Sequence, residues 1–482
     1  MPELPEIQAI VTSGFAHLHH GRYFFLQVAN RKLAQAWLRA ILPHVATSAR
    51  RPDGPKKRPD TIVQVCFSAT GLAAMGLDPG NLKVQFPREF FIGMAGGERP
   101  NVLGDTGDSA PDKWQVGGAA NWTDDDKPVS NLHLLLMLYT TSTAELDRVM
   151  HTHLADAAAA GLKELYRQDS RRDPEGREPF GYLDGISQPA ILGVPAKVLP
   201  GQDVLQPGEF LLGYENGYEQ QSPTPKVPAA LDVNNVLPAG EQPDQKDFGR
   251  NGTFLIFRKL AQDVDLLNSF VSDLARKPDG TVDHARKDLI EAKFVGRWKS
   301  GAPLTLSPDQ DDPALGKDSK RNNDFMFRPT DEQGDRCPVG AHIRRCNPRD
   351  ALMANAKGEK SVTISNRHRI IRRGRPFLDE QEPLKKNQQG LLFICVNADI
   401  QRQFEFIQQT WINNEKFDGL YEDKDPLVGN VDSPPGSTGT HTIQGCPVRH
   451  RVKGIPRFVH VRGGGYFFMP SISALKFLSA LV

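Results

Sequence analysis

A carboxylate set between small and apolar residues is the first candidate for chemistry in this sequence. The stretch PFGYLDGISQPAI (179–191) places Asp184 directly before Gly185, after a charged, loop-like segment. A carboxylate at the edge of an apolar pocket can accept and return a proton, which is general acid–base catalysis. Asp-Gly is also common turn chemistry, and on the pattern alone a turn is the more frequent interpretation.

A histidine followed by arginines is the second candidate. In RCPVGAHIRRCNPRD (336–350), His342 follows the small residues Gly340 and Ala341. A neutral imidazole with small neighbours suits haem iron, because the macrocycle must approach the ring closely. Charge-assisted bonds from the next arginines could neutralise haem propionates. Those arginines are Arg344, Arg345 and Arg349. The alternative is an incidental histidine in a solvated basic loop, which is more common for a lone histidine.

The third candidate is an arginine-rich stretch, SNRHRIIRRGRPF (365–377). A short strand at its apolar centre would turn Arg372 and Arg373 to opposite faces, because strand side chains alternate. One of them would then enter a pocket, and the other would face solvent. A nucleic-acid patch is the alternative interpretation of so many arginines.

A second histidine competes with His342 as an iron ligand. The sequence Cys-Pro-Val occurs at 337–339 and again at 446–448, where His450 follows it. The second copy lacks the Gly-Ala pair and is followed by charged residues. His342 is therefore the favoured ligand.

The overall composition is that of a folded protein without charge bias. The chain has 482 residues, 39% of them hydrophobic, and 59 Lys+Arg balance 58 Asp+Glu. A dedicated nucleic-acid or membrane-surface protein usually carries a basic excess, so we expect neither nucleic acid nor membrane as a partner.

The N-terminus and the cysteines bear on location. No apolar run reaches the ~18 residues of a membrane span, and the first residues have no basic leader, so no signal peptide is expected. The five cysteines are scattered and include no C-x-x-C pair, which argues against structural zinc. Scattered cysteines without a leader predict reduced thiols and a cytoplasmic location.

The elements that must position these residues follow a repeated plan, a strand followed at once by a helix. The strands are expected at 22–30, 131–140, 251–260, 390–399 and 457–470, and the stretch 61–77 fits the same strand–helix plan. Helix starts are indicated at Ser142 or Thr143 and at Asn397 or Asp399. Such units separated by long loops predict a mixed α+β fold. Two related halves, divided between about 190 and 205, are the simplest explanation.

The ordered set of motifs resembles the dye-decolorizing peroxidase family. The resemblance covers most of the chain from about residue 131 and is carried by four stretches. These are GYLDGISQP, CPVGAHIRRCNPR, RIIRRGRPF and GLLFICVNADIQRQFEFIQQTW. It implies an α+β fold of two ferredoxin-like domains, at 1–195 and 196–482, with antiparallel sheets packed face to face and peripheral helices. It also implies one haem b per chain, held mainly by the second domain.

The resemblance assigns roles residue by residue. His342 matches the proximal iron ligand, Asp184 the distal carboxylate and Arg372 the distal arginine. Arg349 matches a propionate partner. The remaining cofactor-binding matches are Gly185, Ile186 and Ser187 at the haem edge, and Leu391 and Phe393 in the distal pocket. Glu405 is the candidate acidic partner of His342, and Gly374 stands where some members have a second polar distal residue.

The implied activity is that of a peroxidase. Hydrogen peroxide would oxidise the haem to a ferryl intermediate, and dyes, phenols or other organic reductants would restore it. An aspartate has an ordinary pKa of ~3.9, so we expect Asp184 to support an acidic optimum. The family often moves electrons through surface Tyr or Trp, and Trp411, Tyr421 and Tyr466 belong to the haem-binding half. The alternatives are a non-catalytic haem-binding protein or another haem enzyme on the same fold.

Overall fold

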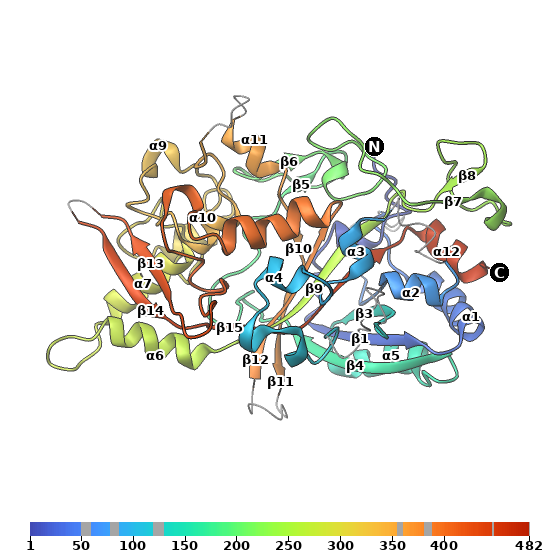
Figure 1. Cartoon of the computed structure of the whole chain (residues 1–482), viewed down its shortest axis with the longest axis horizontal. Helices are drawn as coiled ribbons and strands as arrows, with labels where there is room; N and C mark the ends of the chain where they lie inside the picture. The colour runs from blue at the N-terminus through green and yellow to red at the C-terminus, as the bar shows by residue number, and fades with distance from the viewer. Residues whose placement is uncertain are drawn as a thin grey trace.

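The structure is a computed structural model. It describes residues 1–49, 59–77, 86–118, 130–353, 360–379, 388–445 and 448–481. An antiparallel sheet runs through its centre, and strands from both halves of the chain share it (Figure 1). The strand order is β10-β12-β9-β15-β2-β3-β1-β4, with β11 paired to β12.

The strands of this sheet fall where aromatic and aliphatic residues concentrate in the sequence. The first half contributes β1 (His20–Val28), β2 (Thr61–Phe67), β3 (Leu134–Thr140) and β4 (Leu162–Arg171). The second half contributes β9 (Thr253–Gln262), β10 (Ile371–Arg372), β11 (Arg375–Asp379), β12 (Gln388–Asn397) and β15 (Val459–Met469). The expected strands are therefore confirmed, whereas β4, which carries many charged residues, was not expected.

The two halves meet edge to edge and also face each other. β15 joins β2 at the pair Phe468 and Phe67. The rings of Phe25 on β1 and Phe257 on β9 lie 4.8 Å apart in a core that both halves share. The α+β class, with the antiparallel strands of one half packed against those of the other, is confirmed. The division at residue 195 stays a prediction.

Helices pack on one face of the sheet in both halves of the chain (Figure 1). Those packed on the first half are α1 (Arg31–Ile41), α5 (Thr143–Leu154) and α12 (Ile472–Ala480). Those of the second half include α6 (Val264–Leu274), α7 (His284–Val295), α10 (His342–Cys346) and α11 (Ser361–Asn366), beside the hairpin β13 (Gly439–Ile443) and β14 (His450–Ile455). The loops also contain short helices, which are α2 (Ala69–Ala74), α3 (Arg88–Ile92), α4 (Arg99–Leu103), α8 (Pro313–Lys317) and α9 (Arg328–Asp331).

Side-chain caps fix the helix starts that the sequence indicates. Ser142 accepts the backbone N–H of Glu145 and begins α5. Asp399 accepts the N–H of Arg402 and begins a wide helix of π type, η8 (Ile400–Glu405) followed by η9 (Ile407–Ile412). π-type turns are rare and often mark functional sites. In the described part of the chain, no helix combines the length and apolarity needed to cross a membrane.

Candidate active site

The candidate site is a cavity of about 290 Å³, lined mainly by the second half of the chain and also by residues 103–105 and 178–187 of the first. One wall is the sheet face formed by β9, β12 and β15, and the other is formed by α7, α10, η8 and η9. The predicted residues that line it are Asp184, Gly185, Ile186, Ser187, His342, Arg349, Arg372, Leu391 and Phe393. The fold thus brings every predicted catalytic and cofactor-binding residue to one cavity.

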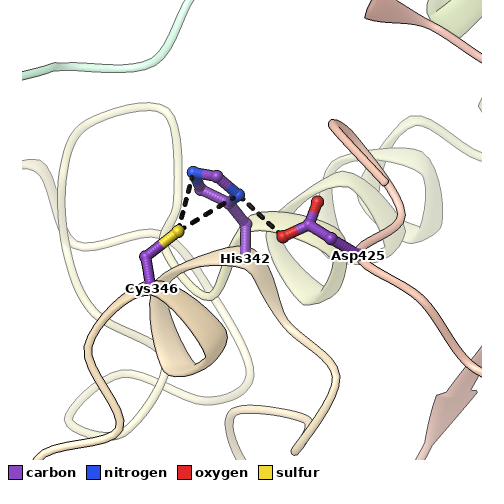
Figure 2. A group of neighbouring side chains, drawn as sticks. All are labelled: His342, Cys346 and Asp425. Carbon is purple, nitrogen blue, oxygen red and sulfur yellow. Dashed lines mark hydrogen bonds and ion pairs between the residues drawn. The ribbon is translucent and has the colours of Figure 1, made fainter. Parts of the chain in front are cut away.

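His342 opens helix α10, and a buried carboxylate holds its ring (Figure 2). Asp425 Oδ2 lies 2.8 Å from His342 Nδ1. Asp425 Oδ1 accepts the N–H groups of Leu427 and Val428 at 2.9 and 3.0 Å. Burial favours the neutral acid, but the imidazole and the amides hold the pKa of Asp425 below its usual range. A carboxylate on Nδ1 fixes the tautomer and leaves Nε2 to bind a metal.

Cys346 lies one turn further along α10 and packs beside the same ring (Figure 2). Its Sγ is 3.7 Å from His342 Nε2 and 3.8 Å from Nδ1. Nearly equal distances place the sulfur against the ring face, off the line of either lone pair. Burial lowers the pKa of His342, but Cys346 and Asp425 outweigh it and raise that pKa well above its usual value. A metal on Nε2 must therefore displace a proton.

A second pair of side chains, Asp184 and Arg372, lines the cavity from a loop and from β10. Arg372 Nη1 donates to Asp184 Oδ1 at 3.0 Å, and the two side chains are 34% and 33% exposed. Asp184 Oδ1 also accepts the N–H of Gly185, whose φ of 84° favours glycine. This pair is open to a small solute, and it combines a proton acceptor with a fixed cation.

Strand alternation separates Arg372 from its neighbour. Arg373 Nε donates to the carbonyl of Ile10 at 2.7 Å, and its Nη2 donates to that of Val11 at 2.8 Å. Arg372 therefore faces the cavity, while Arg373 binds the N-terminal segment instead of facing solvent as the sequence predicted.

Two buried guanidinium groups line the cavity near Asn323. Arg297 and Arg349 are 6% and 7% exposed, and within the described residues they donate to neutral oxygens, with no carboxylate among them. Burial first, and a neighbouring arginine second, lower the pKa of Arg297 to about 9 and that of Arg349 to about 10. Buried cations without counterions favour an anionic ligand.

The backbone of Arg349 is held in an unusual conformation. Its φ of 53° lies in the left-handed region. The hydroxyls of Ser361 and Ser365 donate to its carbonyl oxygen at 2.8 and 2.9 Å. Strained backbone that the surroundings stabilise is typical of ligand-binding positions.

Relatives of known activity match almost the whole chain. A dye-decolorizing peroxidase of Mycena epipterygia is 31% identical, over 95% of this chain and 84% of that protein. A second, from Mycetinis scorodonius, is also 31% identical, over 94% and 83%. The chain belongs to the dye-decolorizing peroxidase family. No protein-family model matches it.

Solved structures of this family agree with the fold. A dye-decolorizing peroxidase in complex with 2,6-dimethoxyphenol has a TM-score of 0.75 at 26% identity, with both chains covered completely. A fungal member from Auricularia auricula-judae has a TM-score of 0.77 at 27% identity, again over both whole chains. Dye-decolorizing peroxidases are haem peroxidases, and this chain is an enzyme of that class.

The cavity of this dye-decolorizing peroxidase fits haem. His342 offers an imidazole nitrogen whose partner nitrogen is anchored, as haem iron requires. Apolar side chains such as Leu391 and Phe393 line the cavity. Arg297 and Arg349 are buried cations without carboxylate partners in the described region, and they match the anionic propionates of haem.

The predicted acidic partner of His342 was wrong. Glu405 accepts hydrogen bonds from Tyr466 and Arg99 at 2.7 and 2.6 Å, and it does not contact His342. The helix of Glu405 turns it away from the cavity, whereas Asp425 arrives from a loop 83 positions beyond His342. Nothing in that loop sequence marks Asp425 as a histidine partner.

The reason given for the small residues before His342 was also wrong. Neither Gly340 nor Ala341 lines the cavity. A Cβ on Gly340 would come within 3.2 Å of His441 Nδ1 and 3.4 Å of Leu420 Cδ1. The glycine therefore allows the chain to pack closely behind the histidine, not on its ligand side.

Two of the arginines after His342 do not reach the cavity. Arg344 donates to the carbonyl oxygens of Asp331, Cys337 and Glu332. Arg345 likewise binds backbone carbonyls, including those of Gly340 and Trp411. Both side chains are completely buried and hold loops together through these hydrogen bonds. Of the three arginines, Arg349 is the one that lines the cavity.

The rival ligand His450 lies elsewhere. It is exposed on β14 and does not line the cavity. Cys446 and Pro447, which suggested the repeat, lie outside the described residues.

Arg297 was not identified from the sequence as a cavity residue, because its stretch, GRWKSG, resembles an ordinary helix end.

Proposed function

We propose that this enzyme binds one haem b in the cavity and uses hydrogen peroxide to oxidise dyes, phenols and other organic reductants. The observation that carries the proposal is that His342, anchored by Asp425, shares one cavity with the Asp184–Arg372 pair. An iron ligand and a peroxide-handling pair are the two parts that such a reaction requires.

His342 Nε2 would hold the iron, and Arg297 and Arg349 would hold the propionates. Bound haem supplies the redox-active iron at which peroxide is reduced. Asp425 accepts a hydrogen bond from His342 Nδ1 and attracts its proton. This increases the electron density on the ring, so Nε2 becomes a stronger electron donor to the metal. Backbone carbonyls already orient Arg297 and Arg349, so these side chains would need to move little to bind the haem propionates.

Asp184 and Arg372 would handle the peroxide. The carboxylate of Asp184 takes the proton from one oxygen of hydrogen peroxide and gives it to the other, which then leaves as water. Arg372 stabilises the negative charge on the departing oxygen, because its guanidinium is a cation that lies against Asp184. Gly374 has no room for another polar group, since a Cβ there would lie 2.9 Å from Leu392 O.

A solved relative supports phenols as reductants. That dye-decolorizing peroxidase was solved in complex with 2,6-dimethoxyphenol. We extend this substrate class to the present chain.

The described cysteines are unpaired, which supports the prediction of a reducing, cytoplasmic compartment.

A non-catalytic haem carrier is the competing function. A carrier has no need for an Asp–Arg pair open to solvent within the haem cavity, so this pair favours an enzyme. The test is the absorbance spectrum of the haem-loaded protein before and after one equivalent of hydrogen peroxide, followed by addition of a dye. We expect a rapid spectral change and dye oxidation. A haem spectrum that peroxide leaves unchanged would contradict the proposal.

A further inference from the structure

The loop that carries Asp184 is attached to Arg372 at two points. Asp184 Oδ1 accepts a hydrogen bond from Arg372 Nη1 at 3.0 Å. Four residues later, Gln188 Oε1 accepts the backbone N–H of the same arginine, also at 3.0 Å. The first contact joins the two side chains proposed to handle peroxide. Gln188 itself does not line the cavity, so the second contact calls for another explanation.

The bond from Gln188 falls on the outer edge of the sheet. β10 lies at the end of the described strand order and pairs with β12. Arg373 donates its backbone N–H to Ile394 of β12 at 2.6 Å, and alternate N–H groups of a strand point to opposite sides. The N–H of Arg372 therefore points away from β12. An edge strand leaves such donors unpaired, and here a glutamine side chain takes the place of a further strand.

The backbone after Asp184 has few other attachments. Before it, the chain is held, because Asp184 donates its backbone N–H to Gly176 O at 3.0 Å. Gly185, with a φ of 84°, comes next, and a Cβ there would meet nothing within 4 Å. In the described part of the chain, the N–H groups of residues 186–188 have no backbone partner. The position of this stretch on the sheet thus depends on the Gln188 side chain.

Gln188 is itself held by a fixed element. Gln202 Nε2 donates to the Gln188 carbonyl oxygen at 2.9 Å. Pro189 is buried, and β5 (Ala190–Ile191) follows directly and pairs with β6 (Val204–Leu205). Gln188 is therefore the point at which the Asp184 loop is joined both to this pair of strands and to β10.

We propose that Gln188 is a positioning residue for the reaction with peroxide, because it sets the distance between Asp184 and Arg372. Its bond to the Arg372 backbone fixes the loop to β10 without using either of the two reacting side chains. The inference rests on the proposed function, which gives Asp184 and Arg372 their roles.

The bond matters most when peroxide enters. The direct contact between Asp184 and Arg372 must then give way, because both groups turn to the substrate. The bond of Gln188 to the Arg372 backbone does not involve the substrate and can persist. A misplacement of ~1 Å in an active site can cost about 10²-fold in rate. The loop keeps its attachment at Gly176, so we expect a smaller loss, of about tenfold.

The test is a double-mutant cycle on the haem-loaded enzyme, with the rate constant for hydrogen peroxide measured by stopped-flow absorbance. Gln188→Met keeps the length of the side chain but removes the acceptor oxygen, and it should slow the reaction about tenfold. In the Asp184→Asn protein, the same substitution should change the rate by less than about twofold, because Gln188 acts through Asp184.

Gln8→Met is the matched control. Gln8 Oε1 also accepts a backbone N–H, that of Val65, and neither residue lines the cavity. This variant should lower the melting temperature but leave the peroxide rate within about twofold of wild type. If Gln188→Met does not fold or load haem, Gln202→Met takes its place in the cycle. It releases the Gln188 carbonyl and should slow the reaction about threefold, again only when Asp184 is present.

Three outcomes would overturn the inference while the wild-type reaction with peroxide still supports the proposed function. The first is a wild-type rate in Gln188→Met. The second is the same slowing with Asp184 and with Asn at position 184, as a merely structural role would give. The third is a wild-type rate in Asp184→Asn, which leaves Gln188 nothing to position. A wild-type protein that binds haem but does not react with peroxide overturns both proposals.

Discussion

The histidine side of the cavity and the aspartate–arginine side are built in opposite ways. On the histidine side, Asp425 is completely buried and both of its oxygens accept hydrogen bonds. On the other side, Asp184 and Arg372 are about one-third exposed and joined by one contact of 3.0 Å. The first arrangement fixes a ligand in one orientation. The second keeps a carboxylate and a cation accessible to a small substrate.

This difference predicts that substitutions on the two sides of the cavity affect different properties, haem binding on one side and the rate with peroxide on the other. Damage to the histidine side should release haem, whereas damage to the aspartate–arginine side should slow the reaction with peroxide and leave haem bound. The largest expected effect is on the rate. Replacing Arg372 with Leu removes the cation from the departing oxygen and should slow peroxide cleavage by about 10²–10³-fold, measured by stopped-flow absorbance.

The adjacent arginine is the matched control for that variant. Arg373→Leu removes bonds to the carbonyls of Ile10 and Val11, so it should lower stability but leave the peroxide rate within about threefold, because it does not face the cavity. A rate that falls with Arg373→Leu and not with Arg372→Leu would reverse the assignment of the two side chains.

The next effect concerns haem affinity. Asp425→Asn leaves His342 Nδ1 with a neutral partner and should weaken haem binding by about 10–100-fold, the usual cost of losing such a partner. Asp423→Asn is the control in the same loop, since Asp423 binds Thr440 and Thr442 and not the ring. Haem titration checks both variants. Equal losses would show that loop stability, and not the bond to His342, sets the affinity.

The histidine side shows where the sequence was sufficient and where it was not. Local patterns located the strands and the caps at Ser142 and Asp399, because each depends on neighbours in the chain, whereas the ordered set of motifs singled out His342. The partner of His342 depends on how a distant loop folds back, and no local pattern encodes that. Glu405 was a candidate because the resemblance implies an acidic partner for His342, but the direction of a helical side chain is set by the turn of η8.

A smaller effect is the pH dependence of stability. Burial lowers the pKa of His133, His368 and His441 to about 4. An unfolded histidine has a pKa near ~6.5, so between those values the unfolded chain binds more protons than the folded one. The contribution of these histidines to stability should therefore fall as the pH drops from about 6.5 to about 4, opposite in sign to that of buried carboxylates whose pKa is raised, such as Glu405.

Urea unfolding at a series of pH values measures this dependence. His368→Gln should flatten the slope, because one buried imidazole no longer titrates. A pH slope in His368→Gln equal to that of the wild type would contradict the assignment of a neutral, buried His368.

The smallest expected effect is at Gly340, behind the histidine. An added methyl group would press on His441 and Leu420, and Gly340→Ala should cost about 1 kcal/mol of stability. Gly14→Ala is the control, because its Cβ would meet only Arg373 Cδ at an ordinary 3.7 Å. Thermal unfolding compares them. Equal midpoints for the two variants would remove the packing explanation for Gly340.

The most direct test of His342 as the iron ligand is a haem titration of the His342→Ala protein, followed in the absorbance spectrum and compared with wild type and His450→Ala. We expect His342→Ala to lose the wild-type spectrum and most of the haem affinity, because no other imidazole lines the described cavity. His450→Ala should bind haem normally, since His450 is exposed on β14. Full haem occupancy with an unchanged spectrum in His342→Ala would contradict the assignment.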